Sequence, residues 1–127
     1  MFELTDLSLT QARKALREGE ISSQELTQAC LERISLLEPV LHAFLTLVPE
    51  EALRRAQAAD QILRAWRAEP TFPLPPLLGL PIAVKDVLCV KDIRCTCGSR
   101  ILENFIPPFS ASAVERLLQA GVVILGK

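Results

Sequence analysis

The N-terminal part of the chain carries two amphipathic patterns, each opened by a polar capping sequence. Ser8-Leu-Thr-Gln11 and Ser22-Ser-Gln-Glu25 have the form of a capping box, in which the first and fourth residues satisfy free backbone groups at a helix start. Apolar residues follow each box at helical spacing, so both segments are predicted to be helices. Gly19 is expected to end the first helix, and Pro39 is expected to end the second at or just before Glu38.

The next two segments differ in length and in residue type. The run Val40–Val48 is apolar and too short for a typical helix, so it is predicted to be a strand. Pro49, followed by Glu50 and Glu51, is typical of a helix start, because proline suits the first helical position and acidic residues favour the helix N-terminus. This helix has a narrow inward face, made of Ala52, Ala56, Ala59, Leu63 and Trp66.

The remainder of the chain has shorter apolar runs. Four prolines between residues 69 and 78 predict a stiff, extended connection. It leads to a predicted strand, Leu80–Lys85, and then to an irregular stretch, Asp86–Phe109. A helix is expected from about Ser110 or Ser112 through Gln119, and residues 122–125 form a continuous apolar run that predicts a second strand.

This order of elements predicts an α/β fold. A strand, a crossover that contains a helix, and a second strand are typical of a sheet covered by helices. The chain is therefore divided into an N-terminal helical region (1–68), a proline-rich connection (69–78) and the start of a sheet-containing core (79–127), all within a single domain.

Composition narrows the class of protein. Half of the 127 residues are hydrophobic, which is enough to build a core. With 14 basic and 15 acidic residues, the net charge of −1 gives no basic surface for direct nucleic-acid binding. The first residues, Met-Phe-Glu-Leu-Thr-Asp, lack the basic start and long apolar stretch of a signal peptide, and no apolar run is long enough to span a bilayer. These features predict a soluble, cytoplasmic protein without a membrane partner.

The cysteines and the single histidine are not in metal-binding patterns. Cys95 and Cys97 are separated by one residue rather than two, and no second pair or neighbouring histidine completes a tetrahedral site. The four cysteines, Cys30, Cys89, Cys95 and Cys97, are expected to be reduced and to pack as small apolar residues. His42 is interpreted as a hydrogen-bonded structural histidine.

Lys85 is the residue whose position suggests chemistry. It ends the predicted strand in Gly79-Leu-Pro-Ile-Ala-Val-Lys85-Asp86, where burial would favour the neutral amine, a form that can accept a proton. The alternative is a lysine that reaches water from the strand end and pairs with Asp86 or another carboxylate. The octapeptide alone favours this second, structural interpretation.

The sequence resembles the amidase signature family over nearly its whole length. A segment similar to Gly79-Leu-Pro-Ile-Ala-Val-Lys85-Asp86 is found throughout that family. Ile93-Arg94, Thr96-Cys-Gly-Ser99, Ile101-Leu-Glu-Asn-Phe105 and Pro107-Pro108 are most similar to the branch that forms the A subunit of Asp/Glu-tRNA amidotransferases. Asp92 stands where relatives often have glycine, so a turn that needs a positive φ there would be mildly strained, although aspartate tolerates this conformation better than most residues.

The resemblance implies a fold and a catalytic role. The family fold is an extensive mixed sheet wrapped by helices, so this chain is expected to be an incomplete amidase signature fold. Lys85 matches the catalytic lysine of a triad with two serines, which lie in a glycine- and serine-rich segment downstream of residue 127. The lysine acts as general base and relays a proton from the nucleophilic serine through the second serine. Ser99, Ser110 and Ser112 do not match the catalytic serines.

The same resemblance implies partners and an activity. As a full-length protein the chain would be a glutaminase that supplies ammonia for converting Glu-tRNA(Gln) or Asp-tRNA(Asn) to the amidated form. Its partners would be the B and C subunits of a heterotrimer, with tRNA contacted mainly through the B subunit. The A subunit would need no cofactor, whereas the partner would use ATP and magnesium.

Two alternatives are open: a stand-alone amidase of the same family, and a non-catalytic module that binds a partner through its N-terminal helices. Because no helix or cap follows the apolar run at residues 122–125, the chain is expected to be an N-terminal fragment, inactive and poorly folded by itself.

Overall fold

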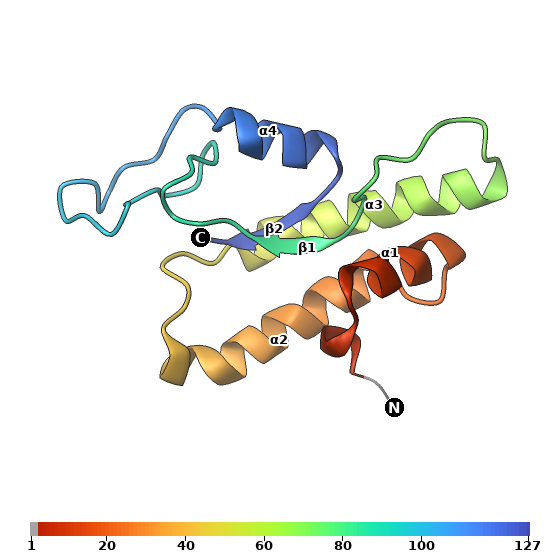
Figure 1. Cartoon of the computed structure of the whole chain (residues 1–127), viewed down its shortest axis with the longest axis horizontal. Coiled ribbons are helices and arrows are strands. Elements are labelled where there is room, and N and C mark those ends of the chain that lie inside the picture. The colour runs from red at the N-terminus through yellow and green to blue at the C-terminus, as the bar shows by residue number, and fades with distance from the viewer. Residues whose placement is uncertain (1–2) are drawn as a thin grey trace.

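A computed structural model describes residues 3–127 of the chain; Met1 and Phe2, which belong to the predicted N-terminal helical region, lie outside the described residues. Figure 1 shows an open arrangement in which helices surround two short strands. In chain order the elements are the 3-10 helix η1 (Leu4–Asp6), α1 (Leu9–Glu18), α2 (Ser23–Leu41), α3 (Pro49–Ala68), β1 (Pro81–Ala83), α4 (Ser112–Gln119) and β2 (Val123–Gly126).

The two capping boxes predicted from the sequence are confirmed. At the start of α1, Ser8 accepts a hydrogen bond from Gln11 N at 3.3 Å, and Gln11 Oε1 accepts one from Ser8 N at 2.8 Å. Ser22 and Glu25 form the same reciprocal pair at the start of α2. Gly19 ends α1 in the left-handed conformation, with φ 79°. Local sequence therefore determines where these helices begin and where α1 ends.

The predicted end of α2 is wrong. The helix continues through Pro39 to Leu41, and His42 closes it in the left-handed conformation (φ 49°) with its N–H donating to Glu38 O at 2.9 Å. Proline removes one backbone donor from a helix interior. Here the affected carbonyl belongs to Ser35, an exposed residue that water can reach, so the helix tolerates the loss. His42 is an exposed helix cap.

The run Val40–Val48, which is predicted to be a strand, does not form one. Its first two residues belong to α2, and the rest forms only an isolated antiparallel bridge between Leu47 and Gly126. Backbone hydrogen bonds nevertheless attach it to the end of β2, from Leu45 N to Lys127 O at 2.8 Å and from Lys127 N to Thr46 O at 2.8 Å. A Cβ atom on Gly126 would lie 2.3 Å from Thr46 O, so only glycine permits this close approach.

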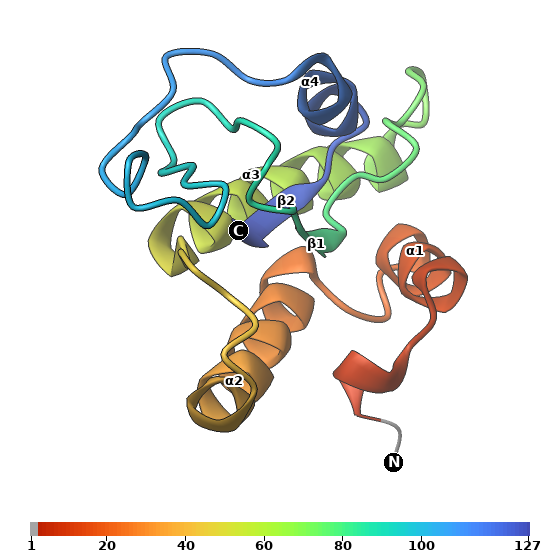
Figure 2. The ribbon, with the colours of Figure 1, turned by 60° about the vertical axis from the view of Figure 1, so that its left-hand side comes forward.

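The two strands pair in parallel, as predicted for a strand, crossover and strand. Figures 1 and 2 both show them between α4 on one side and α1 and α2 on the other, with α3 alongside. From Val122, the residue before β2, to Leu125, successive side chains alternate between two parts of the core. Val123 and Leu125 pack with the small residues Ala52 and Ala56 of α3, whereas Val122 and Ile124 pack with Val114 of α4.

The α/β prediction is therefore confirmed, and β2 is covered on both faces. The sheet consists of two parallel strands, and the isolated antiparallel bridge between Leu47 and Gly126 lies beside it.

A buried polar contact joins α2, α3 and Gly79, the residue that follows the proline-rich connection. Asp60 of α3 is 4% exposed, and its carboxylate accepts hydrogen bonds from Ser23 N at 2.7 Å and Gln24 N at 3.1 Å. The Ser23 hydroxyl donates to Gly79 O at 2.6 Å. A carboxylate at free helix N–H groups is favourable, because it satisfies two donors and interacts with the helix dipole. Asp60 thus fixes the start of α2 against α3.

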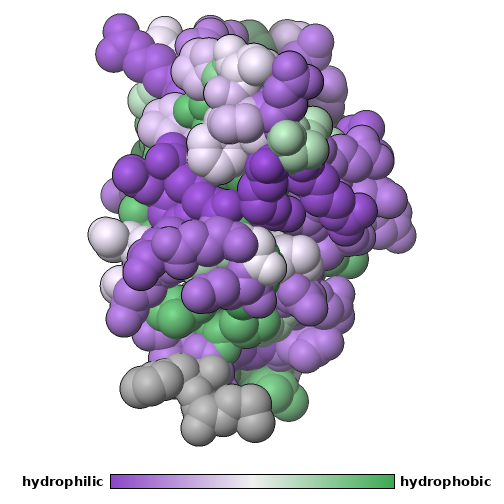
Figure 3. Space-filling model, turned by 90° about the vertical axis from the view of Figure 1, so that its right-hand side faces the viewer, coloured by the Kyte–Doolittle hydropathy of each residue, from purple (hydrophilic) through white to green (hydrophobic). Residues whose placement is uncertain are grey.

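The molecular surface differs between its ends. The end turned toward the viewer in Figure 3 is mostly hydrophilic, with small hydrophobic areas between charged side chains. By contrast, the C-terminal half of α2 exposes large apolar side chains, including Leu36 (78% exposed) and Val40 (80% exposed). Among the apolar side chains of α2, Leu26 in the first turns is buried, whereas Cys30, Leu31 and Ile34 are only partly buried.

Candidate functional site

Lys85 lies two residues after the end of β1, and it is exposed rather than buried. The expectation that the strand buries this lysine is therefore wrong for this chain. The physical reason is the alternation of side chains in extended backbone: Val84 enters the core cluster with Val114, whereas Ala83 and Lys85 point to the opposite, open side. Lys85 consequently presents its amine to solvent.

The buried lysine of this region is Lys127, which immediately follows β2. Its side chain is 0% exposed. Lys127 Nζ lies 3.5 Å from Asp86 Oδ1 and donates a hydrogen bond to Leu88 O at 2.5 Å. An ammonium without water needs such partners, since burying an unpaired charge is very unfavourable. The alternative interpretation is confirmed in that Lys85 reaches water from the strand end, but the ion pair expected with Asp86 is not formed, because Asp86 pairs with Lys127.

Asp86 organises the loop that follows Lys85. Its Oδ2 accepts hydrogen bonds from Thr96 N at 3.0 Å and from the Thr96 hydroxyl. Its backbone carbonyl accepts from Cys97 N at 3.1 Å and from the Cys95 thiol at 3.2 Å. Burial by itself would raise the pKa of Asp86, but the Thr96 hydrogen bonds and the charge of Lys127 outweigh it and lower the pKa below 3.8. The carboxylate is therefore ionised at neutral pH.

These residues line a cavity of about 400 Å³ at the carboxyl ends of the two parallel strands. We call it the Lys85 cavity; it is lined by Ala43, Phe44, Leu45, Ala83, Val84, Lys85, Asp86 and Lys127. The carboxyl edge of parallel strands is where α/β proteins commonly bind ligands. No serine of residues 3–127 lines the cavity, and Ser110 instead accepts a hydrogen bond from Lys91 N at 2.9 Å.

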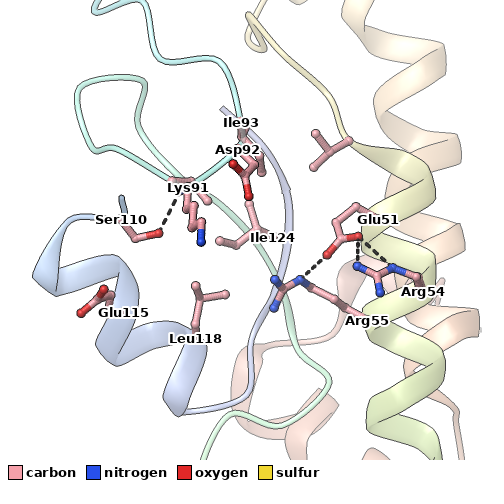
Figure 4. Close-up of a pocket in the computed structure, with 12 residues that line it drawn as sticks. Glu51, Arg54, Arg55, Lys91, Asp92, Ile93, Ser110, Glu115, Leu118 and Ile124 are labelled. Atoms are coloured by element: carbon pink, nitrogen blue, oxygen red, sulfur yellow. Dashed lines mark hydrogen bonds and ion pairs between the residues drawn. The ribbon is translucent and has the colours of Figure 1, made fainter. Parts of the chain in front are cut away.

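A second, larger cavity of about 540 Å³ lies on another side of β2. In Figure 4, Lys91, Ser110 and Glu115 lie on one side of it, and Glu51 with its two arginines lies on the other. Both arginines bind Glu51, whose pKa is lowered because their hydrogen bonds and charge outweigh the effect of burial. The Lys85 cavity is the better candidate site, because it combines a free amine with a buried ion pair.

Other expected features can be placed in the described part of the chain. Asp92 has φ 64°, so this aspartate adopts the left-handed conformation that glycine favours. Within residues 3–127, no group of three or more histidine, cysteine or acidic residues is arranged to hold a metal ion. No helix in this part of the chain is both long and apolar enough to cross a membrane.

Comparison with known proteins identifies the family of this chain. The family model for amidases matches residues 25–127. The chain belongs to the amidase family. Its curated relatives within the amidases include the A subunit of the glutamyl-tRNA(Gln) amidotransferase of Dehalococcoides mccartyi, 48% identical over all 127 residues. The protein of the same name from Chloroflexus aggregans is 49% identical over the same length. In both cases this amidase chain spans 25% of the relative's length.

Solved structures of amidases show the same arrangement of elements. The peptide amidase from Stenotrophomonas maltophilia superposes with a TM-score of 0.87 at 34% identity, over 100% of this chain and 25% of that one. Fatty acid amide hydrolase superposes with a TM-score of 0.84 at 27% identity, over 96% of this chain and 21% of that one. The described fold is thus part of the amidase signature fold.

Lys127 and Asp60 are organising residues of this amidase chain that the sequence pattern did not identify. Lys127 gave only a partial signal: it lies just beyond the apolar run 122–125, and the sequence does not show which face of that run is covered. Asp60 gave a weaker signal: an acidic residue on the small-residue face of α3, where Ala56, Ala59 and Leu63 are buried.

Proposed function

We propose that this chain is the N-terminal part of the ammonia-supplying subunit of a tRNA-dependent amidotransferase. One observation carries the proposal: an A subunit of the glutamyl-tRNA(Gln) amidotransferase is 48% identical to the chain over its whole length. The chain spans about a quarter of that relative, so the activity belongs to the longer protein.

Within that protein, Lys85 is the general base. Its amine lines a cavity at the carboxyl edge of the parallel strands. In its neutral form, a lysine can accept a proton from a serine hydroxyl, and the resulting alkoxide-like oxygen attacks a carboxamide carbon. The two serines of the triad lie outside residues 1–127. The remaining chain covers Lys85, and the removal of water favours the neutral amine.

Lys127 has a different role in this proposal. It is already buried and bound to Asp86 and Leu88 O, so its charge is used to hold the loop rather than to accept protons. Asp86 and Lys127 are positioning residues, since they fix the backbone that follows Lys85. The division explains why two lysines lie at the same edge of the sheet.

The substrate of this site is glutamine, and the released ammonia passes to the B subunit of a heterotrimer whose third member is the C subunit. There it amidates Glu-tRNA(Gln) or Asp-tRNA(Asn), after activation that uses ATP and magnesium. The A subunit itself needs no cofactor for this reaction. The near-neutral charge of the chain supports a tRNA contact made mainly by the B subunit.

The test uses the complete protein with its partner subunits and measures ammonia release from glutamine. Lys85→Ala should abolish release, and Lys85→Arg should abolish it as well, because a guanidinium cannot lose its proton at working pH. Lys91→Ala is the matched control, since Lys91 is an exposed lysine six residues along the same segment. Near-normal rates in Lys85→Arg would refute the general-base role.

A stand-alone amidase is the second candidate, favoured by the superposition on the peptide amidase. Ammonia release from simple or peptide amides by the protein alone would support it. Release that requires glutamine and the partner subunits would instead support the amidotransferase. Both functions would use the triad, so the Lys85 variants should be inactive in either case. The substrate that releases ammonia is therefore the observation that distinguishes the two functions.

A further inference from the structure

We infer that Cys89 and Cys95 form a reversible disulfide, which makes the loop after Lys85 a site of oxidative modification. The inference does not depend on the proposed function, because it concerns thiols that take no part in amide hydrolysis. All four cysteines of the chain are free in the structure.

The geometry brings the two thiols together from different parts of the loop. Cys89 Sγ lies 4.0 Å from Cys95 Sγ and points its S–H toward it. Cys95 in turn donates its S–H to Asp86 O at 3.2 Å. A disulfide needs an S–S separation of about 2 Å, so the sulfurs must approach by roughly 2 Å. Rotation of both side chains in an irregular segment can supply this movement.

The two thiols also differ in access. Cys95 is 2% exposed, whereas Cys89 is half-buried, so Cys89 is the more accessible thiol of the two. Cys97 is exposed, but it is only two residues from Cys95, and a ring that closes over one intervening residue is strained. Cys89 with Cys95 is therefore the preferred pair.

The oxidant is a small organic disulfide, such as glutathione disulfide. The Cys89 thiolate attacks one sulfur of the reagent, forms a mixed disulfide and releases one thiol. The Cys95 thiolate then attacks Cys89 Sγ and releases the second thiol. Two protein thiols have lost two electrons and two protons, and one reagent disulfide has become two thiols.

Closure of this disulfide changes the contacts beside the candidate site. Cys95 loses its S–H and can no longer donate to the carbonyl of Asp86, the residue next to Lys85. Burial, with the neighbouring Cys95 thiol, raises the pKa of Cys89, so the thiolate is scarce at neutral pH and oxidation should accelerate as the pH rises.

Peptide mapping of the complete protein tests the inference. After treatment with glutathione disulfide at about pH 8.5, where thiolate is more abundant, free thiols are alkylated and the protein is digested with trypsin without reduction. Cleavage after Lys85, Lys91, Arg94 and Arg100 places Cys89 in peptide 86–91, and Cys95 with Cys97 in peptide 95–100. We expect these two peptides to appear as one linked species that disappears on reduction.

Single substitutions identify the partner. Cys97→Ser should keep the linked species, and Cys30→Ser, a change on α2, should also keep it. Cys89→Ser and Cys95→Ser should each remove it. Linkage that survives Cys95→Ser, or a disulfide found only within peptide 95–100, would overturn the inference, as would the absence of any linked species in the unaltered protein.

Discussion

Replacing Asp86 with asparagine should loosen the loop that follows Lys85. The substitution keeps the size of the side chain but removes the negative charge that faces Lys127. The Lys127 ammonium, whose side chain is fully buried, then keeps only Leu88 O as a partner among the described residues. A buried charge that loses its counter-ion is the costly outcome, because water cannot replace the missing carboxylate.

The size of the effect follows from the contact. Removing one partner of a buried pair destabilises a protein by about 3–5 kcal/mol. The lower end applies here, because the two charges are 3.5 Å apart and asparagine can still accept hydrogen bonds from Thr96. A loss of about 3 kcal/mol corresponds to an opening equilibrium that is roughly 100-fold more favourable.

Hydrogen exchange measures the opening of this loop at the two backbone amides that donate to Asp86. The amide of Thr96 donates to the Asp86 carboxylate, and that of Cys97 donates to the Asp86 carbonyl. Both amides are expected to exchange roughly 100-fold faster in Asp86→Asn than in the unaltered complete protein.

A surface change and a double variant serve as controls. Glu51→Gln removes a charge that pairs with two exposed arginines, and it should change stability by less than about 1 kcal/mol. Adding Lys127→Met to Asp86→Asn removes the unpaired ammonium and should restore much of the protection at Thr96. Acceleration of less than about tenfold in the single variant, or no recovery in the double variant, would refute the reasoning.

Two further predictions concern buried carboxylates. Asp60→Ala leaves the N–H groups of Ser23 and Gln24 without their acceptor, so it should lower the stability of the complete protein by about 2 kcal/mol; a melting temperature equal to that of Glu115→Ala, an exposed control, would contradict this. The pKa of Asp86 is lowered in the folded state, so its contribution to stability is present above about pH 4 and is lost as the pH falls through the folded-state value. Protection of Thr96, corrected for intrinsic exchange, should fall below that pH and should not do so in Asp86→Asn.

The helices and the covered strand could be predicted because their causes are local. These causes are the two capping boxes, Gly19 at the end of α1, Pro49 at the start of α3 and the small-residue face of α3. Each acts within a few residues, and together they locate α1, the start of α2 and all of α3. The end of α2 could not be predicted in the same way. Whether Pro39 ends a helix depends on whether water can reach the carbonyl it leaves free, and that depends on the tertiary arrangement.

The role of Lys85 stays a prediction, and the structure shows only the environment in which this residue lies. The family resemblance identifies Lys85, and its position at the strand edge agrees with that choice. The burial of Lys127 could not be deduced, because side-chain alternation shows which residues share a face of a strand but not which face is covered. The partner of Asp86 could not be deduced either. Its neighbour in sequence is Lys85, but its carboxylate pairs with Lys127, 41 positions later in the chain.

Because the α2–α3 segment is attached to β2, it differs from the proline-rich connection as a place to insert a tag. Residues 42–48 resemble an ordinary surface loop in secondary structure, yet their backbone is hydrogen-bonded to Leu125 and Lys127 and lies against Gly126 with no room for a Cβ. A tag inserted between residues 42 and 48 would break these hydrogen bonds. The proline-rich connection is exposed around Phe72 and Pro73, and the backbone of these two residues makes no hydrogen bond to another element. A label or an affinity peptide is better tolerated there, where added residues displace only solvent.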